Sequence, residues 1–192
     1  MPGKRLGGFG SATHLVARFF GSVAPVGPRK GSQQWALGHL NSAERALFLS
    51  MSAADRRHAI GVARRALRLE GEERVGETSA PAGFVAAALM HDVGKVESGL
   101  GTFSRVFATL AAVAVGRERL VARAAARPGN GKRRPAARLA AYLEHDRLGA
   151  ELLDRAGSHP LTSTWARDHH LPEERWRVEK DVGRYLKEAD GD

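Results

Sequence analysis

From residue 42 onward, apolar residues recur at the three- and four-residue spacing of amphipathic helices. In residues 53–69, for example, Ile60, Ala63 and Leu67 fall on one helical face. No stretch shows the sustained alternation of apolar and polar residues that marks a half-buried strand. Ala, Leu, Arg and Glu, which are good helix formers, dominate the chain, and aromatic residues make up only 6% of it. The pattern predicts an all-α fold.

The N-terminal residues have a different composition. Residues 1–41 are rich in Gly, Pro and Ser, which break regular structure. We expect them to form a basic, partly disordered arm with one short helix near residues 14–20. Asn41 or Ser42 can cap the first helix of the domain. Residues 42–192 are therefore predicted to form a single-domain helical bundle, a size that one hydrophobic core can support.

Periodicity and helix-breaking residues define the expected elements of this domain. Gly71 is expected to end the second helix, and Pro81 suits the first turn of the third. A Gly-, Pro- and Arg-rich stretch at residues 127–135 is expected to form a loop. The expected helices span residues 43–51, 53–69, 82–91, 102–115, 136–156, 160–168 and 182–189.

The formal net charge of +9 is unevenly distributed. Residues 1–43 contain basic residues and no acidic one, and residues 117–138 contain Glu118 as their single acid. Basic segments attract anions such as nucleotides or nucleic acid. Solvated helix faces are the simpler explanation, because no aromatic residues interleave with these bases as single-strand binding requires. A nucleic-acid partner stays open as an alternative.

The chain contains no cysteine, which excludes disulfides and thiolate metal sites. Any metal ion must therefore be bound by imidazole and carboxylate groups. The most apolar run, residues 106–115, reaches about half of the ~20 residues that a membrane-spanning helix needs. Arg18 interrupts the N-terminal apolar stretch, which argues against a secretory signal. We expect a cytoplasmic protein without a membrane span.

Five of the eight histidines lie within or at the ends of the expected helices. His58 lies inside one helix, His91 ends the next, and His145 begins a helical stretch. The pair His169-His170 closes a further helix. Together with carboxylates, imidazoles suit Mn, Fe, Ni, Co or Zn and disfavour calcium. The pattern indicates a site for a divalent transition metal.

Two carboxylates complete the candidate ligand set. Asp92 directly follows His91, and Asp190 follows the last expected helix. Inward-facing side chains of different helices converge in a bundle, so these groups can share one site. A first ion would be held by His58, His91, Asp92 and Asp190. A second, bridged through Asp92, would be completed by His145 and His169 or His170; two ions ~3.5–4 Å apart activate water and offset charge on the reacting oxygens.

At this point the chain resembles a known family. His58, His91-Asp92 and Asp190, in this order on helices, look like the ligands of the HD-domain superfamily of metal-dependent phosphohydrolases, and the string His-Asp-Val-Gly-Lys at residues 91–95 is similar to its signature. His145, Gly149 and the pair His169-His170 resemble its six-ligand, binuclear branch. The resemblance covers about residues 42–190. It implies an HD-type all-α fold and hydrolysis of phosphate esters, commonly nucleotides, cyclic nucleotides or nucleic acid.

One departure from the family pattern limits the substrate. The branch that hydrolyses cyclic di-GMP follows its histidine pair with Gly-Tyr-Pro, whereas here Leu171-Pro172-Glu173-Glu174 follows. That substrate is therefore not supported. Which of His169 and His170 is the ligand stays open, with His169 favoured.

Asp92 and Lys95 are the candidate catalytic residues. An acid at a helix C-terminus, such as Asp92, is disfavoured by the helix dipole, and a bound metal would remove that conflict. The Lys95 ammonium suits contact with a phosphate oxyanion beside the metal. It is equally explained as a cation that the helix dipole favours.

The sequence thus predicts an enzyme, a divalent-metal-dependent phosphohydrolase with one or two metal ions. Its expected substrate is a small phosphate ester, a nucleotide or a related phosphorylated metabolite. Two alternatives stay open. The family also contains non-catalytic regulatory domains, so the chain can be a nucleotide-sensing module, and its basic segments can bind nucleic acid.

Overall fold

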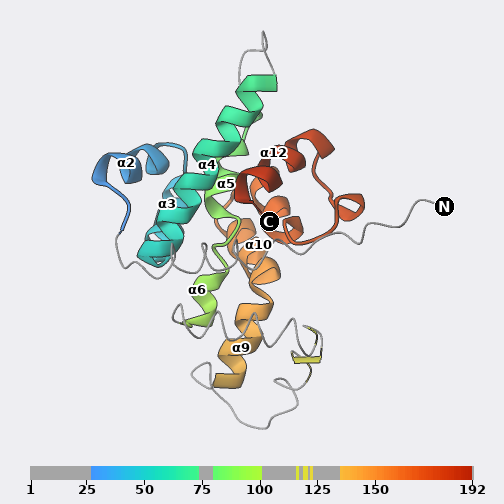
Figure 1. The fold of residues 1–192 in the computed structure, drawn as a ribbon. Helices are drawn as coiled ribbons and strands as arrows, with labels where there is room; N and C mark the ends of the chain where they lie inside the picture. The colour runs from blue at the N-terminus through green and yellow to red at the C-terminus, as the bar shows by residue number, and fades with distance from the viewer. Residues whose placement is uncertain are drawn as a thin grey trace, which may run out of the picture.

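The computed structural model describes residues 27–73, 80–100, 116, 119–120, 122 and 135–191. Within these ranges every regular element is a helix, which confirms the predicted all-α class (Figure 1). The elements are, in chain order, α2 (Lys30–Gly38), α3 (Ser42–Ser50), α4 (Ala53–Glu73), α5 (Phe84–Met90), α6 (Lys95–Ser98), α9 (Pro135–Leu143), α10 (His145–Arg155), α11 (Pro160–Asp168), the 3-10 turn η1 (Glu173–Arg175) and α12 (Lys180–Asp190).

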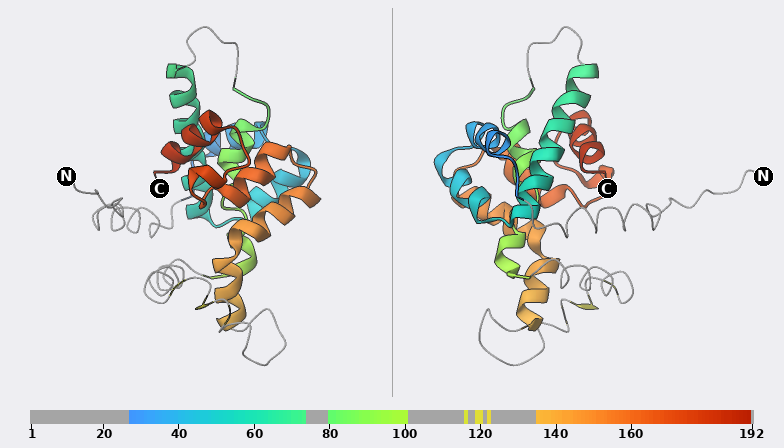
Figure 2. Two further views of the ribbon diagram at one scale, coloured as in Figure 1. Left: turned by 90° about the vertical axis from the view of Figure 1, so that its right-hand side faces the viewer. Right: turned by 60° about the vertical axis from the view of Figure 1, so that its left-hand side comes forward.

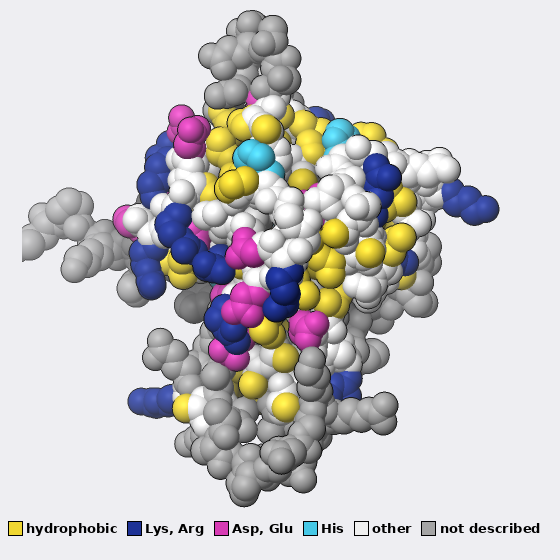
Figure 3. Space-filling view, turned by 180° about the vertical axis from the view of Figure 1, so that it is seen from behind, with side chains coloured by type: hydrophobic (Ala, Val, Ile, Leu, Met, Phe, Trp, Pro, Cys, Tyr) yellow, Lys and Arg dark blue, Asp and Glu magenta, His cyan; other side chains and the backbone are white. Residues whose placement is uncertain are grey.

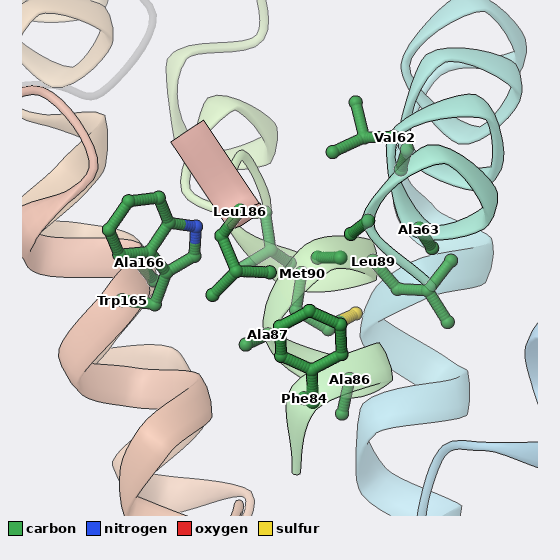
Figure 4. Close-up of a cluster of buried hydrophobic side chains, with 14 of the residues drawn as sticks. Val62, Ala63, Phe84, Ala86, Ala87, Leu89, Met90, Trp165, Ala166 and Leu186 are labelled. Atoms are coloured by element: carbon green, nitrogen blue, oxygen red, sulfur yellow. The ribbon is translucent and has the colours of Figure 1, made fainter. Parts of the chain in front are cut away.

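Helix α5 is the buried centre of the bundle. Its sequence, Phe-Val-Ala-Ala-Ala-Leu-Met, is apolar on all sides, and every residue except Val85 is buried. Helix α4 packs on one side of it and α11 on the other, as Figure 4 shows. The three alanines let both neighbours approach closely. Burial of the large side chains Phe84, Leu89 and Met90 contributes about 1.5–3 kcal/mol each.

Helices α4 and α12 are amphipathic and pack against each other. On α4, Val62 and Ala63 are buried, whereas Arg64 is exposed. Helix α12 buries Leu186 and Ala189 at a spacing of three residues. The packing places the last turn of α12 beside the N-terminal half of α4.

Helices α6 and α9 pack against each other and extend away from the bundle (Figures 1 and 2). Arg138 of α9 joins them by donating from Nε to the Ser98 carbonyl at 3.1 Å. The prediction of one unbroken helix over residues 136–156 is wrong, because the chain breaks between α9 and α10 at Glu144 (φ −105°, ψ 17°). The Tyr142 carbonyl just before the break accepts a bond from the ring of His145.

Other predicted boundaries also shift. Helix α4 continues through Gly71 to Glu73, since a helix interior tolerates one glycine at a cost of about 1 kcal/mol. Pro81 is not in the first turn of α5. Its carbonyl accepts from the Phe84 amide at 3.0 Å in a turn that ends at Gly83, whose φ of 79° suits glycine.

The helical domain also begins earlier than residue 42. Helix α2 packs on α4, and its Ala36, together with Leu40, joins the hydrophobic core. Residues 30–40 therefore belong to the folded domain and not to the expected arm. The remaining arm, the short helix expected near residues 14–20 and the helix expected at 102–115 lie outside the described residues, as does the loop at 127–134.

Helix α3 begins with a capping box. The Asn41 side chain accepts from the Glu44 amide at 2.9 Å, and the Glu44 carboxylate accepts from the Asn41 amide at 2.8 Å. The two bonds satisfy donors that a helix N-terminus leaves unpaired. Asn41, one of the two expected caps, is thus the cap that forms.

Charges of both signs cover the surface. On the rear face, basic and acidic side chains lie next to one another (Figure 3). Residues 1–26 and most of 117–138, which carry the basic segments, are not among the described residues, so nucleic-acid binding stays a prediction. Of the described helices, none has both the length and the apolar character needed to cross a membrane.

Candidate metal centre

The side chains predicted to bind metal meet at one place in the bundle. They come from α4, from the turns after α5 and α11, and from the ends of α10 and α12. Two groups, each with its ligand atoms within 4.8 Å of one another, share Asp92. One comprises His58, His91 and Asp92, and the other comprises Asp92, His145, His169 and His170.

Three of the histidines are oriented by the same hydrogen bond. His91 and His169 are the C-caps of α5 and α11, and His145 follows the end of α9. In each, ring Nδ1 lies within hydrogen-bonding distance of the carbonyl three residues earlier. The partners are Ala88 at 2.9 Å, Ala166 at 2.9 Å and Tyr142 at 2.7 Å. Carbonyls in the last turn of a helix lie beyond the regular intrahelical donors, and here they accept from the histidine rings.

This bond also decides which ring nitrogen faces the site. A carbonyl oxygen can only accept, so Nδ1 must carry the proton and donate. In the neutral ring, Nε2 then keeps its lone pair and points towards Asp92. Metal-binding histidines in proteins are commonly held by this kind of contact behind the ring.

We call His58, His91, Asp190 and the Oδ2 atom of Asp92 the His58 half of the centre. His58 Nε2 donates to Asp190 Oδ1 at 2.9 Å. His91 Nε2 lies 3.7 Å from the same oxygen and 3.5 Å from Asp92 Oδ2. The Lys95 ammonium forms an ion pair with Asp92 Oδ2. His58 is the most exposed of these side chains, at 35%.

We call His145, His169, His170 and Asp92 Oδ1 the His145 half. Asp92 Oδ1 lies 3.3 Å from His145 Nε2 and 3.8 Å from His169 Nε2. His170 Nε2 lies 3.2 Å from His145 Nε2, where it can donate to that lone pair. His169 is buried and anchored through Nδ1, whereas His170 is exposed at the rim. The preference for His169 as the ligand agrees with this difference.

Three atoms at the centre are buried without a hydrogen-bond partner. They are His91 Nε2, Asp92 Oδ1 and His169 Nε2. Buried polar atoms in proteins are nearly always paired, because leaving one unpaired costs about 1–3 kcal/mol. All three are atoms that a cation would contact. The residues present therefore fit a metal ion, and the cluster can hold one.

The electrostatics of the carboxylates favour cation binding. Burial alone would raise the pKa of Asp92, but Lys95 and His91 offset it and hold that pKa well below its usual value. Burial also opposes ionisation of Asp190, yet the neighbouring His91 and His58 lower its pKa. Both groups are therefore charged at neutral pH.

The pKa values of His169 and His170 are lowered, so these two rings stay neutral. Burial, followed by the nearby His170 and His91, holds the pKa of His169 well below its usual value. Although His170 lies at the rim, desolvation of its ring, followed by the neighbouring His145, lowers its pKa to about 3. Neutral imidazole is the form that binds metal.

A close backbone contact brings the two halves together. A Cβ on Gly94 would lie 1.9 Å from the His145 carbonyl oxygen and 2.6 Å from the Gly149 amide. The turn that carries Asp92 can therefore approach the first turn of α10 only with glycine at this position. In the sequence Gly94 stands out only as part of the string at residues 91–95, and this contact was not predicted.

Sequence analysis also missed the residues that support the centre from behind. Arg65 Nε donates to the Ala189 carbonyl at 2.6 Å, next to Asp190, and Lys187 Nζ donates to the His169 carbonyl at 2.9 Å. Fully buried Asp168 accepts from the backbone and guanidinium of Arg177. An acid in the last turn of a helix, where the dipole disfavours it, is the one signal that pointed to such a partner.

Comparisons of the chain with protein-family models, with curated proteins and with solved structures found no match. The buried cluster of histidine and aspartate on a helical framework is compatible with the HD-type site expected from the sequence.

Proposed function

We propose that the protein is a divalent-metal-dependent phosphohydrolase acting on a phosphate ester, with a nucleotide or a related phosphorylated metabolite as substrate. The observation that carries the proposal is the set of buried, unpaired ligand atoms on His91, Asp92 and His169. A purely structural cluster gains nothing from leaving these atoms without partners.

The residues that would hold the metal are those of the two halves. A divalent ion at such a site lowers the pKa of a coordinated water and offsets negative charge on phosphoryl oxygens. The chain contributes rigidity, because carbonyls at helix ends hold the rings of His91, His145 and His169 in one orientation. Fixed ligands need little reorganisation during the reaction.

Lys95 is the residue proposed to contact the substrate. Its side chain is 20% exposed while its ammonium reaches Asp92. An ammonium at the centre on a partly exposed side chain can bind a phosphate oxygen beside the metal. The nucleotide part of the proposal rests on the resemblance to the HD-domain superfamily.

Metal analysis of the purified protein followed by turnover assays tests the proposal. Protein stripped with a chelator is reloaded with Mn²⁺, Ni²⁺, Co²⁺ or Fe²⁺ and incubated with a panel of mononucleotides, cyclic nucleotides and simple phosphate esters. We expect stoichiometric metal and release of phosphate or nucleotide. Asp92→Ala should abolish both, and Asp154→Ala, a change at an exposed acid of α10, should retain both.

Two other results would point to the alternatives. A nucleotide that raises the melting temperature without being converted indicates a sensing module. Affinity for nucleic acid that falls steeply between ~50 and ~200 mM salt indicates nucleic-acid binding through the basic segments. Absence of any stoichiometric transition metal would contradict the phosphohydrolase itself.

A further inference from the structure

The Lys95 ammonium is bonded to an atom that a metal ion at the centre would otherwise bind. The ammonium is paired with Asp92 Oδ2, the carboxylate oxygen that faces His91 at 3.5 Å and so belongs to the His58 half. The other oxygen, Oδ1, faces the His145 half and has no hydrogen-bond partner. One carboxylate therefore presents a neutralised oxygen to one half and an available oxygen to the other.

Two of the remaining ligand atoms of the His58 half are also engaged, whereas His91 Nε2 is buried and unpaired. The proton on His58 Nε2 is donated to Asp190 Oδ1 at 2.9 Å, so both atoms must give up this bond before they bind a cation. In the His145 half, Asp92 Oδ1 and His169 Nε2 are buried and unpaired. An ion entering the His145 half has to displace the contact between His170 and His145, whereas the Lys95 ammonium lies on the other oxygen of Asp92.

We propose that Lys95 acts as an internal cation that competes with a metal ion for the His58 half. Metal then loads in two steps, first and tightly at the His145 half, and second and weakly at the His58 half. The second ion gains its full ligand set only when the ammonium leaves Asp92 Oδ2.

A phosphate group can provide that release. Because the Lys95 side chain is partly exposed, its ammonium can exchange the bond to Asp92 for a bond to a phosphate oxygen, which frees Oδ2 for the second ion. Phosphate and the second metal ion then strengthen each other's binding, because coupling between two sites is reciprocal. This regulation rests on the proposed function, in which the phosphate belongs to the substrate, and it makes the complete two-metal centre dependent on substrate.

Mn²⁺ binding to the chelator-stripped full chain tests the inference without any measurement of turnover. Free Mn²⁺ is followed by electron paramagnetic resonance during titration, with and without inorganic phosphate. Wild-type protein should bind one tight and one weak ion, and phosphate should tighten the weak one by about 5–150-fold. In Lys95→Met the weak ion should bind at least about tenfold more tightly without phosphate, and phosphate should add less than in the wild type.

Two variants keep the test specific. Lys95→Arg retains a cation and should preserve the weak second step, whereas Lys30→Met, a change at an exposed lysine of α2, should behave as wild type. Unchanged or weaker binding of the second ion in Lys95→Met would overturn the inference, as would equal affinities in the wild type. If the predicted binding is observed but no phosphate ester is hydrolysed, the proposed function fails and the two-step loading stands.

Discussion

The two halves of the centre share a carboxylate but differ in how their ligands are held. In the His145 half, His145 and His169 are buried and fixed by carbonyls at helix ends. In the His58 half, His91 is held in the same way, but His58 projects from within α4, is 35% exposed and is bonded to Asp190. At a helix end the carbonyl three residues earlier accepts from the histidine ring and fixes its orientation, whereas His58, within α4, is bonded to Asp190 instead.

This difference between the halves indicates where a cation would bind more tightly. Unpaired buried atoms are costly in the free protein, so a ligand that pairs them gains the most. Atoms that already bond one another must first separate. The His145 half is thus the prepared part of the centre, and the His58 half is the adjustable part.

The largest effect is expected where the two halves meet. Gly94→Ala places a methyl group against backbone atoms that cannot move independently, so we expect a loss of about 3 kcal/mol or more in the free energy of unfolding. Denaturant unfolding measures it. Gly38→Ala, where no atom lies within 4 Å of the added Cβ, should change stability little. Equal stabilities of the two variants would show that the close contact is not required.

Ligand removal tests the comparison directly. His169→Ala should weaken the tight metal ion by at least the ~10–100-fold that loss of a group behind a ligand costs. His58→Ala should leave the tight ion and remove the weak one. Isothermal titration calorimetry with Mn²⁺ distinguishes the two, and His39→Gln, at an exposed histidine outside the cluster, serves as the control. Loss of the tight ion in His58→Ala, with the tight ion retained in His169→Ala, would contradict this comparison of the halves.

A smaller effect is expected from loss of the ion pair between Arg177 and Asp168, which lies next to the His145 half. Arg177→Ala removes the guanidinium from fully buried Asp168, next to His169. We expect a loss of about 1–3 kcal/mol of stability, because a buried carboxylate loses hydrogen bonds. The tight ion should weaken while the weak one is unaffected. Arg184→Ala, at an exposed ion pair, is the matched control and should leave thermal unfolding nearly unchanged.

The smallest effect concerns pH. In the metal-free folded protein the pKa values of His169 and His170 are lowered. As the pH falls, these two histidines therefore take up protons at a higher pH in the unfolded chain than in the folded protein. The stability from neutral rings is fully present above the ordinary histidine pKa of 6.5 and is lost as the pH falls towards about 3. Melting temperatures of chelated protein across this range should therefore fall with acid. His170→Gln should flatten the dependence, and an unchanged slope would contradict it.

Much of the fold follows from local pattern. The 3.6-residue period and the Pro160 start predicted 160–168 as a helix, and α11 spans these residues. Where the prediction was wrong, tertiary contacts outweighed local propensity. Helix α4 passes Gly71, and α2 folds onto the core through Ala36 despite the glycines and serine around it.

The candidate ligands could be predicted by residue type and order, because metal chemistry restricts them to a few side chains and helix ends are visible in the sequence. His58, Asp92 and His169 were all identified in this way. Their metal-ion affinity, the enzyme activity and the substrate stay predictions. The supporting partners Arg177 and Lys187 carry no local signal, since the chain contains 30 lysines and arginines of the same types.

What the sequence determined by itself is the class of fold and the set of chemical groups at the centre. Only the tertiary structure decided that these groups form two unequal halves. Lys95 follows Asp92 by three residues and pairs with one carboxylate oxygen, but His145 reaches the other oxygen only because α10 approaches at Gly94. That approach is a packing contact between segments far apart in the chain, and local periodicity carries no record of it.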